Sequence, residues 1–295
     1  SPMKKLMLGN EAAARGLYEA GCALISSYPG TPSTEITERA AQYDEIYCEW
    51  APNEKVAMEV AFGAALAGKR SACVMKHVGL NVAADPLFTI AYTGVNAGMV
   101  ICVADDPGMH SSQNEQDSRH YAVSAKIPML EPADSAEARD FAKRAFELSE
   151  EYDTPVFLKL CTRISHSQSI LELGQRVEPA RRPYEKDIAK YVMVPGNARP
   201  RHPIVEERTR RLTAFAETTD LNREEMGEDT SIGIITSSTS YQYAREVFGP
   251  KASILKLGLV NPLPKQKILD FAAKVDKVLV LEELDPVIED HCRAL

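Results

Sequence analysis

Four segments of the chain place polar side chains beside glycine or proline in patterns that could serve catalysis or ligand binding. They are residues 28–35, 54–68, 76–81 and 105–120. The first, third and fourth directly follow short apolar runs that are typical of buried strands. Because parallel α/β sheets bind ligands beyond the carboxyl ends of their strands, these segments are the candidate functional sites.

Glu54 is the carboxylate whose surroundings best suit catalysis. It opens a predicted helix, residues 54–67, whose positions from Val56 onward are apolar or small except Glu59. A helix that is apolar all round is expected to be buried, and burial raises the pKa of a glutamate. A simpler interpretation gives Glu54 a favourable contact with the helix dipole, worth at most about 1 kcal/mol. For Glu59, we expect a buried carboxylate whose charge is paired with another side chain for a structural purpose.

The segment from Tyr28 to Glu35 has two interpretations. It follows a buried strand and opens a helix, so Thr31 lies where a ligand would bind. Alternatively, Pro29 and Gly30 form a turn, Thr31 caps the helix, and Pro32 takes the first helical position, where its missing N–H costs nothing. The spacing alone favours the second, purely structural interpretation.

Three further side chains could bind a ligand. His77 lies between a strand and a helix, although a single histidine in such a place is usually structural. The polar loop of residues 105–120 offers the amide of Gln113 and the guanidinium of Arg119 to a carboxylate. Loops of this kind are otherwise often simply solvated.

Short apolar strands alternate with helices along the chain, which predicts a parallel sheet covered on both faces. The predicted helices of the first domain are residues 11–21, 32–42, 54–67, 79–92 and 135–150, and its strands are residues 22–25, 45–49, 71–76, 98–103 and 155–160. Strands 231–236, 253–257 and 277–281 and helices 239–248 and 265–273 form a second, smaller α/β unit.

The domains are predicted at residues 3–162 and 230–295, joined by a connector over residues 163–229 that is rich in charge and proline. Some helix is expected within the connector, near residues 205–216. The last residues resemble a helix cut off in mid-course, so the second domain is expected to be truncated. Ser1 and Pro2 resemble a cloning remnant and are left out of the fold prediction.

The bulk composition excludes several classes of protein. A formal charge of −8 and a pI near 5.4 argue against a nucleic-acid surface, and no apolar run approaches the roughly 20 residues that cross a bilayer. The six cysteines are scattered without any CxxC spacing, so the sequence predicts reduced core thiols and no metal held by this chain alone. Reducing cytoplasm is the expected compartment.

In this order, the four segments resemble the pyrimidine-binding domain of the 2-oxoacid:ferredoxin oxidoreductases, and within that family the indolepyruvate oxidoreductases. The resemblance rests on the run Tyr28-Pro29-Gly30-Thr31-Pro32-Ser33 and on Glu54, nine positions before Gly63 in a helix that ends in Ala67-Gly68. Residues 257–264 of the second unit resemble the transketolase C-terminal-like domain of the same subunit. The likeness therefore covers the whole chain.

The resemblance implies a subunit that binds the aminopyrimidine end of thiamine diphosphate. In the family a carboxyl group matching Glu54 hydrogen-bonds this ring and favours the imino tautomer that deprotonates C2 of the thiazolium. The implied cofactor-binding residues are Tyr28, Pro29, Thr31, Glu54 and His77. The implied substrate-binding residues are Thr31, His77, Gln113 and Arg119.

The implied reaction is oxidative decarboxylation of an aryl 2-oxoacid, such as indolepyruvate, to an acyl-CoA with coenzyme A and ferredoxin. The groups that hold Mg²⁺ and 4Fe-4S clusters in the family do not occur in these residues and are expected in a missing C-terminal part. A beta subunit and a homo-oligomer are the expected partners, and this fragment alone is expected to be inactive.

Two alternatives differ in what they require. A thiamine-dependent decarboxylase or transketolase-like enzyme would need no ferredoxin. A non-catalytic assembly module would only contribute a subunit interface. A pocket near Thr31, Glu54 and His77 favours catalysis, whereas a flat apolar face favours assembly.

Overall fold

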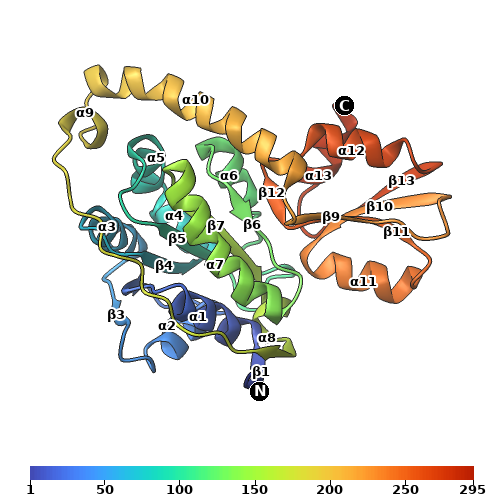
Figure 1. The fold of residues 1–295 in the computed structure, drawn as a ribbon, viewed down its shortest axis with the longest axis horizontal. Helices are drawn as coiled ribbons and strands as arrows, with labels where there is room; N and C mark the ends of the chain where they lie inside the picture. The colour runs from blue at the N-terminus through green and yellow to red at the C-terminus, as the bar shows by residue number, and fades with distance from the viewer.

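A seven-stranded sheet forms the centre of the first domain in the computed structural model, which describes residues 1–295 (Figure 1). The strands lie in the order β12-β6-β7-β5-β4-β2-β3, and every neighbouring pair is parallel except β12 with β6. Their bounds are β2 (Leu24–Ser27), β3 (Tyr47–Trp50), β4 (Ser71–Lys76), β5 (Met99–Asp105), β6 (Met129–Leu130), β7 (Val156–Cys161) and β12 (Leu259–Asn261). The predicted α/β fold with a mainly parallel sheet is confirmed.

Helices cover both faces of this sheet. They are α1 (Gly9–Glu19), α2 (Thr34–Ala40), α3 (Glu54–Leu66), α4 (His77–Val82), α5 (Ala84–Thr93), α6 (Arg119–Ala125), α7 (Ser135–Tyr152) and α8 (Thr162–His166). One apolar core joins the sheet to α1 and α7, and the other joins it to α3 and α5. Because the central strands face apolar helices on both sides, β5 and β7 are buried along their whole length.

The first domain differs from the prediction in several elements. The helix predicted over residues 79–92 is broken at Ala83 into α4 and α5, and the helix predicted over residues 32–42 is limited to α2. Helix α6 and strand β6 were not predicted. Strand β1 (Lys4–Leu8) was not predicted either, and it pairs antiparallel with β8 (Gln168–Glu172).

The connector is more regular than its composition predicts. After the short helix α9 (Ile188–Tyr191), α10 (Pro195–Thr218) continues for 24 residues through two prolines and runs across the first domain toward the second (Figure 1). Tertiary contacts compensate for the prolines: the guanidinium of Arg201 donates to the carbonyl of Tyr92 and that of Arg208 to the carbonyl of Ala91, each at 2.8 Å. These bonds hold α10 against α5.

The second domain is built on a four-stranded sheet in the order β13-β10-β11-β9. Its elements are β9 (Asn222–Glu225), β10 (Ile232–Ser237), α11 (Ser238–Phe248), β11 (Ser253–Leu257), α12 (Lys265–Ala272), β13 (Lys277–Leu281) and α13 (Val287–Arg293). Strand β9 comes from the predicted connector, and β12 leaves the second domain to join the sheet of the first. One strand of the predicted connector thus joins the second sheet, and one strand of the predicted second domain joins the first sheet.

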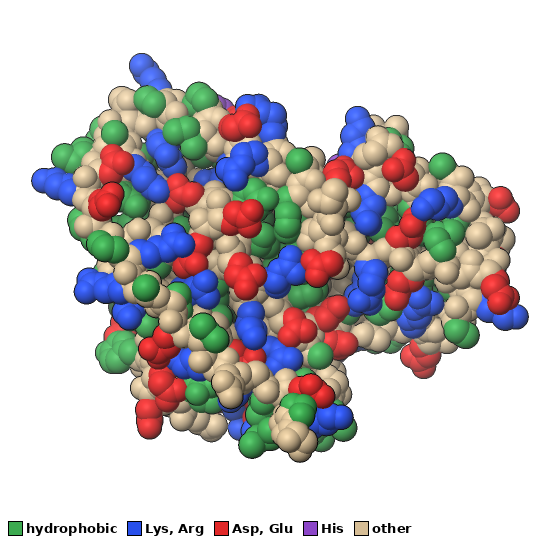
Figure 2. Space-filling view, in the orientation of Figure 1, with side chains coloured by type: hydrophobic (Ala, Val, Ile, Leu, Met, Phe, Trp, Pro, Cys, Tyr) green, Lys and Arg blue, Asp and Glu red, His purple; other side chains and the backbone are tan.

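The six cysteines are free thiols; four of them are buried, and Cys48 and Cys292 are half-buried. None of the helices is long and apolar enough to pass through a membrane. Basic and acidic side chains are interspersed over the face of the molecule in Figure 2.

Candidate active site

The candidate residues lie beyond the carboxyl ends of four strands that are neighbours in the sheet. The order β5-β4-β2-β3 places the loops after β2 and β4 side by side, with Glu54 following β3 and the loop of residues 106–118 following β5. The chain proceeds from β2 to β3 on one side and returns to β4 on the other, which makes this a topological switch point. In open α/β sheets such a point is the usual place for a ligand.

Glu54 is fixed at the start of α3. The side chain of Asn53 caps the helix by accepting from the Val56 N–H at 2.9 Å, so Glu54 occupies the first helical turn. Its carboxylate packs against the backbone of Gly79 in α4, where an added Cβ would lie only 2.4 Å from Glu54 Oε2. Because Gly79 has no side chain, the carboxylate of Glu54 fits between α3 and α4.

The predicted complete burial of α3 is wrong. Ala57, Met58, Ala61 and Ala65 face the core, but Glu59 and Gly63 are exposed. An added Cβ at Gly63 would meet no atom within 4 Å. Glu59 is thus not a buried paired charge, and Glu54 is only half-buried, because one face of the helix is left uncovered by this chain.

His77 is buried, with a relative exposure of 1%, and is only partly hydrogen-bonded. Its Nε2 lies 3.2 Å from the carbonyl oxygen of Asn114, whereas its buried Nδ1 has no partner. Since a carbonyl can only accept, Nε2 carries the proton, and in the neutral ring Nδ1 is left as an acceptor. This orphaned atom fits a ligand that donates an N–H or O–H.

The segment after β2 is an exposed loop and not a helix start. Tyr28, Pro29 and Thr31 are exposed, and α2 begins only at Thr34. Because Ser33 occupies the N-cap position of α2, the predicted cap at Thr31 and the predicted first helical position at Pro32 are both wrong.

Other residues hold that loop. The Gly30 N–H donates to Thr34 Oγ1 at 2.7 Å, the hydroxyl of Ser33 donates to the Gly30 carbonyl at 2.7 Å, and Asn10 donates to the Pro32 carbonyl at 2.7 Å. Thr31 has no part in these bonds. It therefore stays free to meet a ligand.

The loop after β5 is tied to its neighbours at both ends. Asp106 accepts hydrogen bonds from Ser111, Ser112 and Thr162 at 2.8 to 2.9 Å. Burial alone would raise the pKa of Asp106, but these bonds outweigh it and hold the pKa below its usual value. Gln113 is exposed at the outer part of this loop.

Arg119 does not face the candidate site. Its side chain is 2% exposed and pairs with Asp117 and with Glu282 of the second domain, each at 2.7 Å. The same guanidinium donates to the carbonyls of Glu283 and Asp285 at 2.9 Å. Because these partners occupy it, the predicted contact between Arg119 and a substrate carboxylate is not supported, and we assign Arg119 to the domain junction.

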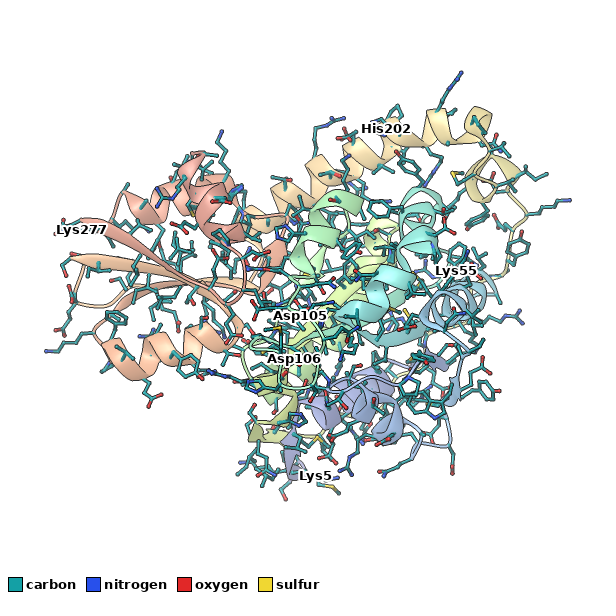
Figure 3. The ribbon with its side chains drawn as sticks, turned by 180° about the vertical axis from the view of Figure 1, so that it is seen from behind. Lys5, Lys55, Asp105, Asp106, His202 and Lys277 are labelled. Atoms are coloured by element: carbon teal, nitrogen blue, oxygen red, sulfur yellow. The ribbon has the colours of Figure 1, made fainter.

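Sequence reasoning missed a buried charge cluster next to Arg119. Lys159 in β7 lies 3.0 Å from Glu131 and 3.7 Å from Asp105, and Figure 3 shows Asp105 and Asp106 near the junction of the two domains. Burial would lower the pKa of Lys159, but the surrounding carboxylates raise it, whereas burial raises the pKa of Asp105. A lysine inside an apolar strand was the available signal for this cluster.

Gly79 and Lys76 belong to the candidate segment of residues 76–81, but the sequence predicted no individual role for either. The side chain of Lys76 lies over Gly30, and its Nζ donates to the Ser111 carbonyl at 3.0 Å. It thereby joins the loops after β2, β4 and β5. The five principal cavities of the chain, of about 240 to 500 Å³, are not lined by Thr31, Glu54 or His77. We call the region around Thr31, Glu54 and His77 the open site, because Thr31 is exposed and Glu54 is half-buried.

The arrangement defines a doubly wound α/β protein whose candidate site lies at the switch point of the sheet. The chain belongs to the family described as pyruvate flavodoxin/ferredoxin oxidoreductase, thiamine diphosphate-binding, which it matches over residues 15–230. The family resemblance drawn from the sequence is confirmed.

Curated relatives lie close in sequence. The indolepyruvate oxidoreductase subunit IorA of Archaeoglobus fulgidus is 43% identical over 304 residues, which cover 99% of this chain and 49% of that protein. The subunit of the same name from Methanothermobacter thermautotrophicus is 45% identical over 300 residues, covering 99% of this chain and 48% of that one. The chain thus spans about half the length of these relatives.

Among solved structures, the chain is similar to the 2-oxoglutarate:ferredoxin oxidoreductase from Magnetococcus marinus, whose structure contains 2-oxoglutarate, coenzyme A and succinyl-CoA. The TM-score is 0.84 over 99% of this chain and 60% of that chain, at 19% identity. A split-gene transketolase is more distant, with a TM-score of 0.56 over 97% of this chain and 84% of that one, at 15% identity. At these identities the likeness shows the fold alone.

Proposed function

We propose that this chain is the pyrimidine-activating part of a thiamine-diphosphate-dependent enzyme that oxidatively decarboxylates an aryl 2-oxoacid to an acyl-CoA, with ferredoxin as the electron acceptor. The observation that carries the proposal is the position of Glu54. Its carboxylate lies against Gly79 at the switch point, in the same strand-end region as the unpartnered Nδ1 of the buried His77.

The residues present fit the aminopyrimidine end of the cofactor. Glu54 holds a proton between its carboxylate and a ring nitrogen of the aminopyrimidine. His77 Nδ1 accepts a hydrogen bond from an amino group, while its Nε2 stays fixed by the Asn114 carbonyl. Tyr28 and Pro29 provide the wall on the side of β2. When bound, thiamine diphosphate supplies a nucleophilic carbon and an electron sink for decarboxylation.

Substrate contacts are assigned to side chains that the protein leaves free. Thr31 is exposed beside the cofactor position and can donate its hydroxyl to the 2-oxoacid, and Gln113 can reach a carboxylate from the loop after β5. His77 would bind a carboxylate only when its ring is protonated, since the neutral ring presents an acceptor. The aryl side chain of the substrate is inferred from the relatives named indolepyruvate oxidoreductase subunits.

The remaining components are proposed for the longer protein and its complex. Mg²⁺ and 4Fe-4S clusters would be held outside these residues, by the remaining half that the relatives possess. A second, beta subunit and a homo-oligomeric assembly complete the proposal. Six free thiols, four of them buried, support a reducing, cytoplasmic compartment.

The proposal is tested by Glu54→Gln in the full-length protein within its complex. Glutamine keeps the shape of the side chain but cannot take up and return a proton, so turnover of indolepyruvate should fall by about 100-fold or more. Cofactor affinity, measured by titration, should fall only a few-fold. Glu59→Gln is the matched control, because it removes an exposed carboxylate from the same helix.

Turnover of the Glu54→Gln enzyme within about threefold of wild type would contradict the assignment. The same result for Glu59→Gln is expected and shows that charge loss on α3 is not itself damaging.

A non-catalytic assembly module is the second candidate. It is favoured by the uncovered face of α3 and by the absence of Thr31, Glu54 and His77 from the walls of the principal cavities. In that case Glu54→Gln would leave turnover intact, and a bulky residue at Gly63 would disrupt the complex.

A further inference from the structure

A cavity of about 500 Å³ opens between the two domains, on the side of the loop after β5. The first domain contributes the loop after β5 and the start of α8, and the second contributes the first turns of α11 and the turn after β13. The side chains that matter for recognition are His110, Thr162, Arg163, Ser240, Tyr243 and Glu283. Neither Thr31 nor Glu54 nor His77 lines this cavity.

The amino-terminal end of α11 opens into the cavity without a side-chain cap. Its N-cap residue, Ser237, makes no capping hydrogen bond. Ser240, in the first turn, lines the cavity and is only 8% exposed, yet its hydroxyl has no hydrogen-bond partner in the protein. Because the first N–H groups of a helix lack intrahelical partners and carry a partial positive charge, this end is suited to an anion. The unpaired hydroxyl of this largely buried residue points to the same ligand.

A free cation lies across the cavity from the helix end. The guanidinium of Arg163 lies over the ring of Tyr243, 5.0 Å from its centroid, and forms no ion pair within 4 Å. Arginine in this situation offers planar donors that match phosphate oxygens. Tyr243 is 41% exposed and leaves an aromatic surface beside the cation.

We propose that this interdomain cavity binds a phosphate-bearing small molecule, with the phosphate between the first turn of α11, the hydroxyl of Ser240 and the guanidinium of Arg163. The cavity volume lies within the range of small-molecule sites and exceeds the needs of a lone phosphate, so the phosphate is part of a larger ester. Tyr243 then contacts the remainder of that ester.

Glu283 lines the same cavity and opposes an anion. Burial raises the pKa of its carboxyl, and nearby Lys159 and Arg163 partly counter this. Arg163 and Glu283 should therefore affect phosphate binding in opposite directions. Loss of the Arg163 charge should weaken phosphate binding, and loss of the Glu283 charge should strengthen it.

The test is isothermal titration of the 295-residue chain with inorganic phosphate, adenosine monophosphate and acetate. Adenosine monophosphate should bind at least about tenfold more tightly than inorganic phosphate, and acetate should bind more weakly than either. Arg163→Gln should weaken binding of adenosine monophosphate by about tenfold or more, and Ser240→Ala by about threefold. Glu283→Gln should tighten it by about threefold.

Arg293→Gln is the control, because this arginine is exposed at the far end of α13 and pairs only with Glu289. It should bind like wild type, and unchanged melting of every ligand-free variant shows that the fold is intact. No binding of either phosphate compound below about 10 mM would overturn the proposal. So would equal binding of acetate, or wild-type affinity in Arg163→Gln.

Discussion

Two regions at the carboxyl edge of the same sheet differ in how far their polar groups are paired within the protein. Beyond β2, β3 and β4, His77 keeps a buried nitrogen unpaired, Thr31 is exposed without partners, and Glu54 is half-buried beside a glycine. Lys159 within β7 and Arg119 beyond β5 are buried among carboxylates that pair with them. The first region keeps groups available for a ligand. In the second, Arg119 joins the two domains, and Lys159 pairs with carboxylates inside the first domain.

The difference explains why similar residue types have unlike roles. A buried charge is tolerated only when it is paired and hydrogen-bonded, so the charged side chains of the junction pair with one another, and only Glu131 Oε2 among their carboxylate oxygens is left buried without a partner. A ligand site leaves such pairing to the ligand. Substitutions in the junction should therefore reduce stability, and substitutions at the open site should alter activity while leaving stability almost unchanged.

The largest effect is expected from Lys159→Met. It leaves Glu131 and Asp105 buried without their cation, which should lower the free energy of unfolding by about 3–5 kcal/mol. Denaturant titration of the chain measures this loss. Lys251→Met is the control, because its pair with Glu228 is exposed and should contribute no more than about 1 kcal/mol. Equal losses in both variants would remove the distinction between the regions.

Asp117→Asn is expected to lower the free energy of unfolding by about 2 kcal/mol, and the loss should depend on pH. Burial alone would raise the pKa of Asp117, but the hydrogen bonds from Arg119 outweigh it and lower the folded pKa. The carboxylate therefore stabilises the fold fully above about pH 4, and this contribution disappears as the pH falls through the folded pKa.

Unfolding of Asp117→Asn should consequently differ from wild type at pH 7 and approach it in acid. Asp105→Asn should show the opposite trend, because burial raises the pKa of Asp105 and the ionised form is disfavoured in the fold. The loss in free energy of unfolding caused by Asp105→Asn should be smaller at pH 7 than in acid. Parallel pH profiles for the two variants would contradict this assignment of charges.

At the open site, Gly79→Ala should lower turnover of the full-length complex by about tenfold, which corresponds to about 1.4 kcal/mol. The added Cβ would lie 2.4 Å from Glu54 Oε2, so the carboxylate must move. Stability should change little, because alanine is the better helix residue. Gly196→Ala in α10 is the control, since its Cβ would meet nothing within 4 Å. Unchanged turnover in Gly79→Ala would show that activity does not depend on the position of the Glu54 carboxylate.

Local sequence pattern predicted the elements that position the site. The predicted strands at residues 71–76, 253–257 and 277–281 have the observed bounds, because apolar runs between turn residues define buried strands well. The start of α3 at Glu54 was predicted as well, and in the structure Asn53 caps it.

Features that depend on residues far apart in the chain could not be predicted from the local sequence pattern. Arg119 turns inward because Glu282, 163 residues away along the chain, completes its ion pairs. Likewise, the close approach of Gly79 to Glu54 joins two helices that the sequence describes separately. Apolar composition predicted a buried α3, but a helix end or face can remain uncovered when the surface that would cover it is not part of the chain.

Thr31→Val is expected to have the smallest effect and separates a ligand role from a capping role. Thr31 is exposed and belongs to no helix cap, so valine should leave the melting temperature unchanged while the KM for indolepyruvate in the full-length complex rises about threefold. Thr34→Val is the matched comparison. It removes the acceptor for the Gly30 N–H, at 2.7 Å, and should cost about 1 kcal/mol of stability. If Thr31→Val instead lowered stability with unchanged kinetics, the loop after β2 would belong with the structural region and not with the ligand site.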